Sequence, residues 1–139
     1  YNAERFDVRG KELLRLRPKY YVVDMAFKQL LLPDINRDRG HVLENVVYLE
    51  LRHRGYTVYV GQLTKGEIDF VAQKPGGILE YYQVSESVLD PTTRDRELAP
   101  LEAVKDQYPK FLLTMDELYK PHNYNGIQQC NVLDWLLGM

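Results

Sequence analysis

The spacing of apolar residues in the middle of the chain predicts a helix followed by a meander of strands. Residues 41–54 carry apolar side chains at helical spacing, and Gly55 is placed to end that helix as its C-terminal cap. Three β-prone stretches follow, separated by turns that contain glycine, at residues 56–62, 67–73 and 78–85. Because these turns are short, we expect the three strands to be joined as hairpins.

A second helix and further strands are predicted after residue 89. Asp90 is a candidate N-cap with Pro91 at the first helical position, and the helix is expected to extend to Gln107 with a break or kink at Pro100. A buried-type strand, a short strand and a last helical turn follow at residues 110–114, 127–131 and 132–137. The core order is therefore α-β-β-β-α-β, which predicts an α/β fold (an α+β mixed sheet).

The N-terminal part is less regular. Residues 1–19 mix arginines and lysines with leucines, and we expect them to form a connecting segment outside the core. A β-prone run at residues 20–23 precedes a helix expected at residues 25–32, and Asp38 is a candidate N-cap for the next helix. The chain begins at Tyr1 without a methionine, which indicates a piece of a longer polypeptide.

Composition narrows the class of protein. The 139 residues suit one domain, and 45% hydrophobic with 27% charged residues is ordinary for a globular protein. The single Cys130 excludes an intrachain disulfide and a multi-cysteine zinc site, and it fits a reducing compartment. No run approaches the roughly 18 apolar residues of a membrane span, so we expect no membrane partner and a cytoplasmic location.

The net charge of −2 does not predict a strongly nucleic-acid-binding surface. DNA binding would therefore need a local basic patch. The best candidate is the set Arg37, Arg39, Arg52, His53 and Arg54. The same residues are also typical of solvated charges around one helix.

Two acids lie two residues apart in the strand at 67–73. Alternation places Glu67 and Asp69 on one face, and the opposite, core-facing side is expected to hold Ile68, Phe70 and Ala72. The two acids then either lie in solvent and pair with Lys65 or Lys74, or gather around a cation.

A cation at this place would have oxygen ligands from three elements. Mg²⁺ binds about six oxygens, commonly one or two carboxylates together with phosphate and water. Asp69 with Glu44 or Glu67 would supply the carboxylates, and Gln83 on the next strand a neutral oxygen. Glu44 lies on a partly apolar helix stripe, so it is either at the core edge or directed at a site. The three histidines show no metal-ligand spacing.

Several short motifs, in their order and spacing, resemble known families. The stretches at residues 40–45, 54–59 and 66–71 (Gly-Glu-Ile-Asp-Phe-Val) resemble the restriction-endonuclease-like, PD-(D/E)XK, nuclease superfamily. More closely, the chain resembles the C-terminal domain of a family of prokaryotic AAA-type P-loop ATPases. That resemblance is carried by residues 81–85, 96–98, 106–110, 114–116, 125–127 and 134–137.

The resemblance implies a domain division and a site. Residues 36–139 would form a restriction-endonuclease-like domain, and residues 1–35 would connect it to an N-terminal ATPase region. The metal-binding positions of the superfamily, for Mg²⁺ or Mn²⁺, fall on Glu44, Asp69 and Gln83. Its catalytic lysine position falls on Ser85, so the catalytic set would be Asp69, Gln83 and Ser85.

Serine cannot replace the positive charge of that lysine, which weakens the expected chemistry. Arg94 or Arg96 at the start of the following helix could supply the charge instead. Two functions follow from the resemblance. One is a nuclease-like, DNA-associated domain with weak or absent cleavage, and the other is an inactive protein-interaction or regulatory domain. In both, the ATPase domain of the same polypeptide is an expected partner.

Overall fold

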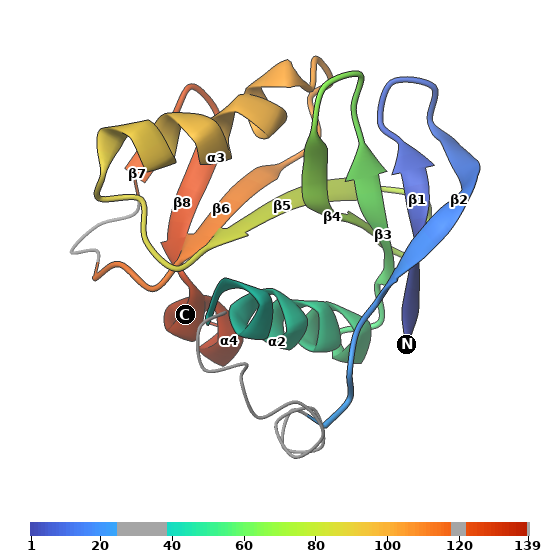
Figure 1. Cartoon of the computed structure of the whole chain (residues 1–139), viewed down its shortest axis with the longest axis horizontal. Helices are drawn as coiled ribbons and strands as arrows, with labels where there is room; N and C mark the ends of the chain where they lie inside the picture. The colour runs from blue at the N-terminus through green and yellow to red at the C-terminus, as the bar shows by residue number, and fades with distance from the viewer. Residues whose placement is uncertain (25–38, 118–121, 139) are drawn as a thin grey trace.

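A single mixed sheet forms the centre of the molecule in a computed structural model, which describes residues 1–24, 39–117 and 122–138 (Figure 1). Among these residues eight strands follow the order β2-β1-β3-β4-β5-β6-β8-β7. Their bounds are β1 (Asn2–Asp7), β2 (Glu12–Tyr20), β3 (Thr57–Gln62), β4 (Glu67–Gln73), β5 (Leu79–Ser85), β6 (Lys110–Thr114), β7 (His122–Tyr124) and β8 (Ile127–Asn131). The predicted α/β class with a mixed sheet is confirmed.

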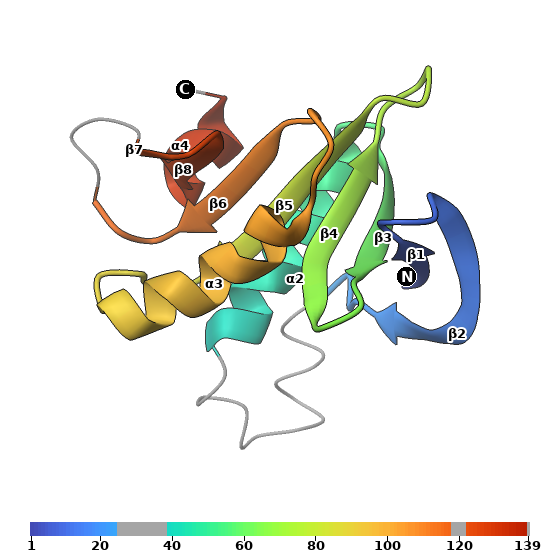
Figure 2. The same ribbon diagram turned by 90° about the horizontal axis from the view of Figure 1, so that it is seen from above.

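Helices cover both faces of the sheet. On one face lie α2 (Arg39–His53) and α4 (Val132–Leu137), and on the other lies α3 (Pro91–Ala103) (Figures 1 and 2). The core accordingly has two parts. Phe70 and Tyr82 pack in the cluster that contains buried residues of α2, whereas Ile68 packs in the cluster that contains buried residues of α3. Central strands are therefore buried on both sides.

The N-terminal residues belong to the sheet, so the expectation that residues 1–19 lie outside the core is wrong. β1 pairs antiparallel with β2 and parallel with β3, where Arg5 lies opposite Val60. Ala3 and Tyr21 are buried in the α2 cluster. The many charges of β2 suit its place at the sheet edge, where Pro18 is also tolerated. That residues 1–35 connect to an ATPase region stays a prediction.

Local signals were accurate for most of the other elements. Asp90 caps α3 by accepting a hydrogen bond from the backbone N–H of Thr93 at 2.8 Å, and Gly55 follows α2 with φ of 85°. In contrast, α3 ends at Ala103 rather than Gln107 and continues through Pro100 without a break. β7 was not predicted. The helix expected at residues 25–32 and the cap at Asp38 lie outside the described residues.

An irregularity between β3 and β4 changes which way the β4 side chains point. Tyr59 lies opposite Val71, but Gly61 lies opposite Ile68, so β4 contains one extra residue. Ile68 therefore packs toward α3, while Phe70 and Ala72 pack toward α2. The expectation that these three side chains share a face is wrong, because strict alternation does not continue through a bulge.

Gly61 is the residue that allows this close packing, and replacing it should destabilise the domain. A Cβ atom at Gly61 would lie 2.9 Å from Cγ2 of Val71 and 3.0 Å from Cβ of Ile68. We expect Gly61→Ala to lower the free energy of unfolding by about 1–3 kcal/mol through overpacking, measured by urea denaturation. Thr57→Ala, an exposed change in the same strand, is the control. Gly→Ala stabilises where alanine fits the backbone conformation and the space around it, so a gain in stability would contradict the close packing.

Candidate functional site

The site lies where β4 and β5 separate, at Asp69. Pairing of the two strands extends from Gln73 to Phe70 and stops there. Beyond Phe70, hydrogen bonds from side chains replace the backbone hydrogen bonds between the two strands. The Asp69 carboxylate accepts a hydrogen bond from the Val84 backbone N–H at 2.8 Å, and the Asp69 backbone N–H donates to the side-chain oxygen Oε1 of Gln83 at 3.3 Å. Asp69 is thereby held at the opening between the strands.

Asp69 is half-buried rather than exposed, and its surroundings favour the protonated acid. Burial in the first place, and the nearby Glu44 carboxylate in the second, raise the pKa of Asp69 from 3.8 to about 7. The Val84 N–H and the Lys19 ammonium act against this shift. Near neutral pH the Asp69 carboxyl is therefore partly protonated, which reduces its electrostatic repulsion with Glu44.

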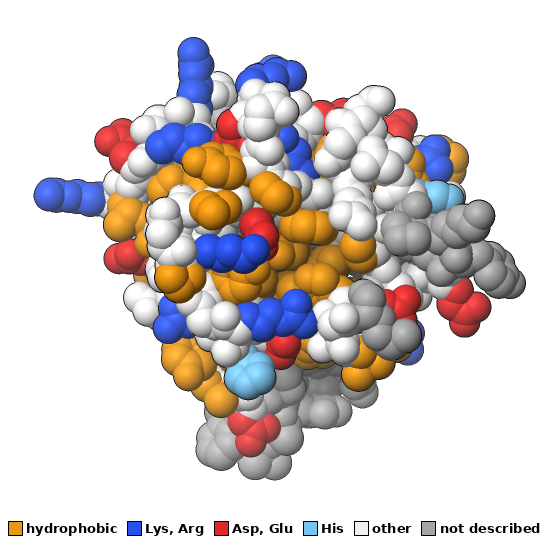
Figure 3. Space-filling view, turned by 180° about the vertical axis from the view of Figure 1, so that it is seen from behind, with side chains coloured by type: hydrophobic (Ala, Val, Ile, Leu, Met, Phe, Trp, Pro, Cys, Tyr) orange, Lys and Arg blue, Asp and Glu red, His pale blue; other side chains and the backbone are white. Residues whose placement is uncertain are grey.

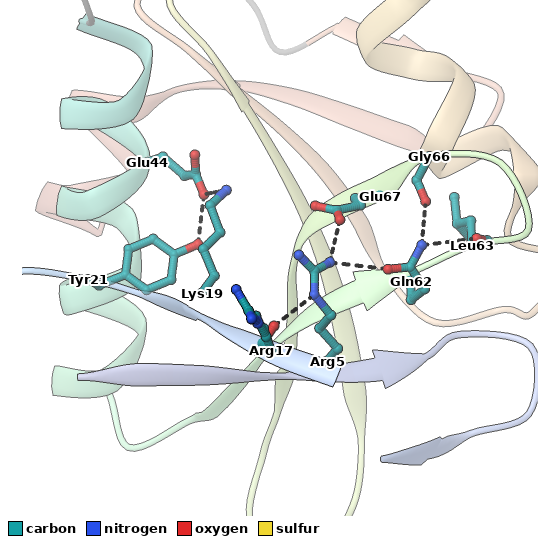
Figure 4. Close-up of polar contacts among 9 residues, drawn as sticks. All are labelled: Arg5, Arg17, Lys19, Tyr21, Glu44, Gln62, Leu63, Gly66 and Glu67. Carbon is teal, nitrogen blue, oxygen red and sulfur yellow. Dashed lines mark hydrogen bonds and ion pairs between the residues drawn. The ribbon is translucent and has the colours of Figure 1, made fainter. Parts of the chain in front are cut away.

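Glu44 points from α2 toward the N-terminal hairpin (Figure 4). Its side chain is buried, and Oε1 accepts hydrogen bonds from the Lys19 ammonium and, at 2.7 Å, from the Tyr21 hydroxyl. Oε2 lies 3.7 Å from Nδ1 of His41. Burial, followed by the charge of Glu44, strongly raises the pKa of Tyr21, so the hydroxyl remains a donor. Of the two readings left open for Glu44, its contacts favour a carboxylate directed at a polar site.

Glu67 belongs to a different set of contacts from Glu44. Figure 4 shows it bonded to Arg5, which also donates to Oε1 of Gln62 at 3.1 Å. Lys74 instead donates to Glu80 at 2.6 Å. The alternative that Glu67 pairs with Lys65 or Lys74 is therefore wrong, because β1, which brings Arg5, was not expected beside β3.

Gln83 and Ser85 lie on β5, and the polar groups of both side chains form hydrogen bonds. The Gln83 amide nitrogen donates to Glu97 of α3 at 3.1 Å, while its oxygen accepts from Asp69. The Ser85 hydroxyl donates to the Ser87 backbone oxygen at 3.2 Å, so it faces its own turn. Arg96, one candidate for the missing positive charge, is bonded to Glu97 at 2.9 Å. The structure thus brings Asp69 and Gln83 into direct contact but directs the Ser85 hydroxyl elsewhere.

Lys19, Tyr21 and Glu97 are polar groups of this site that the sequence did not reveal. Lys19 and Tyr21 come from the hairpin that was taken for a connecting segment, and Glu97 comes from α3. A signal was available in the apolar residues Ala3, Phe6 and Val8, which are buried and belong to the core. Lys19 supplies positive charge close to both Glu44 and Asp69.

The site offers few side-chain oxygens that could coordinate a metal ion. Within the described residues no group of three or more His, Cys, Asp or Glu side chains is close enough to hold a metal. Glu44 and Gln83 already accept hydrogen bonds from Lys19, Tyr21 and Asp69. The residues present therefore fit Mg²⁺ or Mn²⁺ only as two carboxylates completed by phosphate and water, the arrangement common for Mg²⁺ at phosphate substrates.

Two of the described basic residues in or just after α2, Arg39 and Arg54, are paired with acids. Arg39 lies 3.4 Å from Glu86, and Arg54 donates to Glu50 at 2.6 Å while its guanidinium lies 4.2 Å from the centre of the Trp135 ring. On the face seen in Figure 3, Lys and Arg side chains are interspersed with acidic and apolar ones. Arg37 lies outside the described residues. These contacts favour the interpretation of solvated and paired charges around a helix.

Of the helices in the described part of the chain, none combines the length and the apolar character needed to cross a bilayer.

Comparison with known proteins identifies one similar protein, whose description gives no activity. No protein-family model matches the chain, and no solved structure matches it. A protein of Haemophilus influenzae described as uncharacterized is 38% identical over 137 residues, which cover 99% of this chain and 33% of that relative. The chain therefore spans about a third of the length of the curated relative that it matches.

Proposed function

We propose that the chain is a nuclease-like, DNA-associated domain whose metal-dependent phosphodiesterase site is degenerate, so that cleavage is weak or absent. The observation that carries this proposal is the position of Asp69 at the opening between β4 and β5, next to Gln83 and under the electrostatic influence of Glu44. Acids from a helix and from the strands after it are the layout that resembles the PD-(D/E)XK superfamily.

We expect weak phosphodiester cleavage because other groups of the protein already neutralise the charges of the site. Glu44 is bonded to Lys19 and Tyr21, and burial favours a proton on Asp69. Mg²⁺ or Mn²⁺ would have to displace these partners to bind at Glu44, Asp69 and Gln83. When bound, such an ion would stabilise negative charge developing on a phosphate. Lys19 would contribute the positive charge that Ser85 lacks, since it is paired with Glu44 and acts electrostatically on Asp69.

We also propose the wider setting implied by the resemblance. The chain would be the C-terminal domain of a cytoplasmic AAA-type ATPase, with the ATPase domain of the same polypeptide as its partner. The greater length of the Haemophilus influenzae relative, of which the chain covers 33%, is compatible with a further domain.

A second candidate function is a protein-interaction or regulatory domain without catalysis. The specific observation that favours it is that the buried Glu44 and Gln83 already hydrogen-bond to other protein groups. A site of this kind is stable without any ion, as a structural polar network would be.

Metal titration and DNA cleavage separate the two candidates. We expect calorimetry with Mn²⁺ and Mg²⁺, in the presence of a branched DNA, to detect binding that Asp69→Asn weakens at least about tenfold. Slow nicking of plasmid DNA should be lost in parallel. Glu67→Gln is the matched control, because Glu67 is bonded to Arg5 outside the site. A folded protein that binds neither the branched DNA nor the metal ions and shows no cleavage would replace the first candidate by the second.

A further inference from the structure

A cavity of about 660 Å³ lies apart from the candidate site, at the end of the sheet where two hairpins turn. Its walls come from the β1–β2 turn, the β3–β4 turn and the C-terminal end of α3, which gather at the top of Figure 1. Small-molecule sites commonly measure about 300–1,000 Å³. The cavity therefore has the size of a ligand site, and α3 places it on the opposite side of the sheet from Glu44 of α2.

The floor of this cavity is apolar. Val8 and Val104 are buried members of the α3 cluster, and Leu63 packs against the same cluster. Apolar walls of this kind take the uncharged body of a ligand and exclude water from around it. An inorganic ion alone would leave this apolar surface in contact with water.

The rim of the cavity is strongly cationic in a chain whose net charge is −2. Arg9, Lys65 and Lys105 line it, and none of the three side chains has an acidic partner among the residues that the structure describes. A fourth cation, Lys11, is balanced by Asp106. Three positive charges without acidic partners around one concavity raise the local concentration of multivalent anions.

A polar network holds one wall of the cavity in place. The Lys11 ammonium donates to the Asp106 carboxylate and, at 2.6 Å, to the Tyr81 hydroxyl, which itself donates to Asp106 at 2.6 Å. Tyr81 is fully buried in the sheet. The β1–β2 turn is thereby fastened to the segment that follows α3, so the cavity is formed before any ligand arrives and little ordering is needed on binding.

We propose that this cavity binds a phosphorylated small molecule with an apolar or planar body, of the class of nucleoside phosphates. Its phosphates would contact Arg9, Lys65 and Lys105, and its body would lie over the floor at Val8, Leu63 and Val104. Phosphate oxygens are natural partners of Arg and Lys. The concave, mostly apolar shape favours a small molecule over a nucleic-acid backbone, which needs an extended groove.

Calorimetric titration at constant ionic strength tests this site with ADP, adenosine and inorganic pyrophosphate as probes. We expect ADP to bind saturably. Adenosine and pyrophosphate, which each lack one part of ADP, should bind at least about tenfold more weakly, and tenfold corresponds to about 1.4 kcal/mol of binding free energy. Lys65→Glu, in an exposed turn, should weaken ADP binding at least about tenfold by replacing attraction with repulsion. Arg9→Glu should act in the same direction.

Two controls make the result specific to the cavity. Arg15→Glu changes the net charge equally on the exposed side of β2 and should leave ADP affinity within about twofold. Asp69→Asn, which tests the proposed nuclease-like site, should also leave it unchanged. Absence of saturable ADP binding to the folded protein up to about 10 mM, or equal losses in Lys65→Glu and Arg15→Glu, would overturn the proposal. So would binding of single-stranded DNA, but not of ADP, that depends on Lys65.

Discussion

Between about pH 4 and about pH 7, the domain should lose up to about 4 kcal/mol of unfolding free energy relative to an Asp69→Asn variant. The cause is burial, assisted by Glu44, which raises the pKa of Asp69 from 3.8 to about 7 in the folded protein. In this window the folded domain retains a proton that the unfolded chain releases. Stability therefore falls as the pH rises, and above about pH 7 the difference becomes constant.

Urea denaturation followed by circular dichroism at several pH values measures this effect. Asparagine keeps an oxygen for the Val84 N–H and removes the ionisation, so the variant should be the more stable protein at high pH. Glu67→Gln removes an exposed carboxylate from the same strand but retains Asp69, and it should keep the pH slope of the wild-type protein. Parallel curves for the wild-type protein and Asp69→Asn would show that Asp69 is not held in the protonated form.

Lys19→Met should destabilise the domain by about 3 kcal/mol, because it leaves the Glu44 carboxylate without its cation. Glu44 is 7% exposed, and among the residues that the structure describes it would retain the Tyr21 hydroxyl and the more distant His41. Removing one partner of a buried ion pair costs about 3–5 kcal/mol. The lower end applies because 32% of the Lys19 side chain remains exposed. Chemical denaturation at constant pH gives the value.

A double-mutant cycle assigns this loss to the ion pair. Glu44→Gln added to Lys19→Met should recover part of the stability, since a neutral amide in the same place costs less to bury. Arg15→Met, on the same strand but exposed, should change stability by less than about 0.5 kcal/mol. A loss for Lys19→Met no larger than that of Arg15→Met would mean that solvent rather than Lys19 balances Glu44.

Much of the fold was predictable because its signals are local. Gly55 ends α2, Asp90 begins α3, and alternating side chains mark β3. Each of these signals depends on neighbouring residues and works in isolation. The order α2-β3-β4-β5-α3-β6 followed from them, and with it the mixed sheet.

The N-terminal hairpin and the bulge were not predictable for the opposite reason. β1 pairs with a strand about fifty residues later in the chain, and charged edge residues in β2 conceal its alternation. The bulge in β4 depends on Gly61 accepting two branched side chains at close range, which no pattern within β4 reveals.

The candidate site was only partly predictable. Its acids, Glu44 and Asp69, were found because carboxylates on a helix and a strand form a recognisable order. Their partners were not, because Lys19 and Tyr21 approach them only once the hairpin has docked. The sequence therefore indicated which residues carry negative charge, while the fold decides how that charge is balanced.

The interior position of β1 has a consequence for where this unit can be separated from a longer protein. β1 has β2 on one side and β3 on the other. A boundary drawn between residues 35 and 36, where the resemblance places the start of the domain, would remove β1 and leave its backbone N–H and C=O partners on β3 unpaired along a new edge. It would also remove the cation from Glu44. The smallest unit that can be moved as a whole, by recombination or by cloning, must include the first strand.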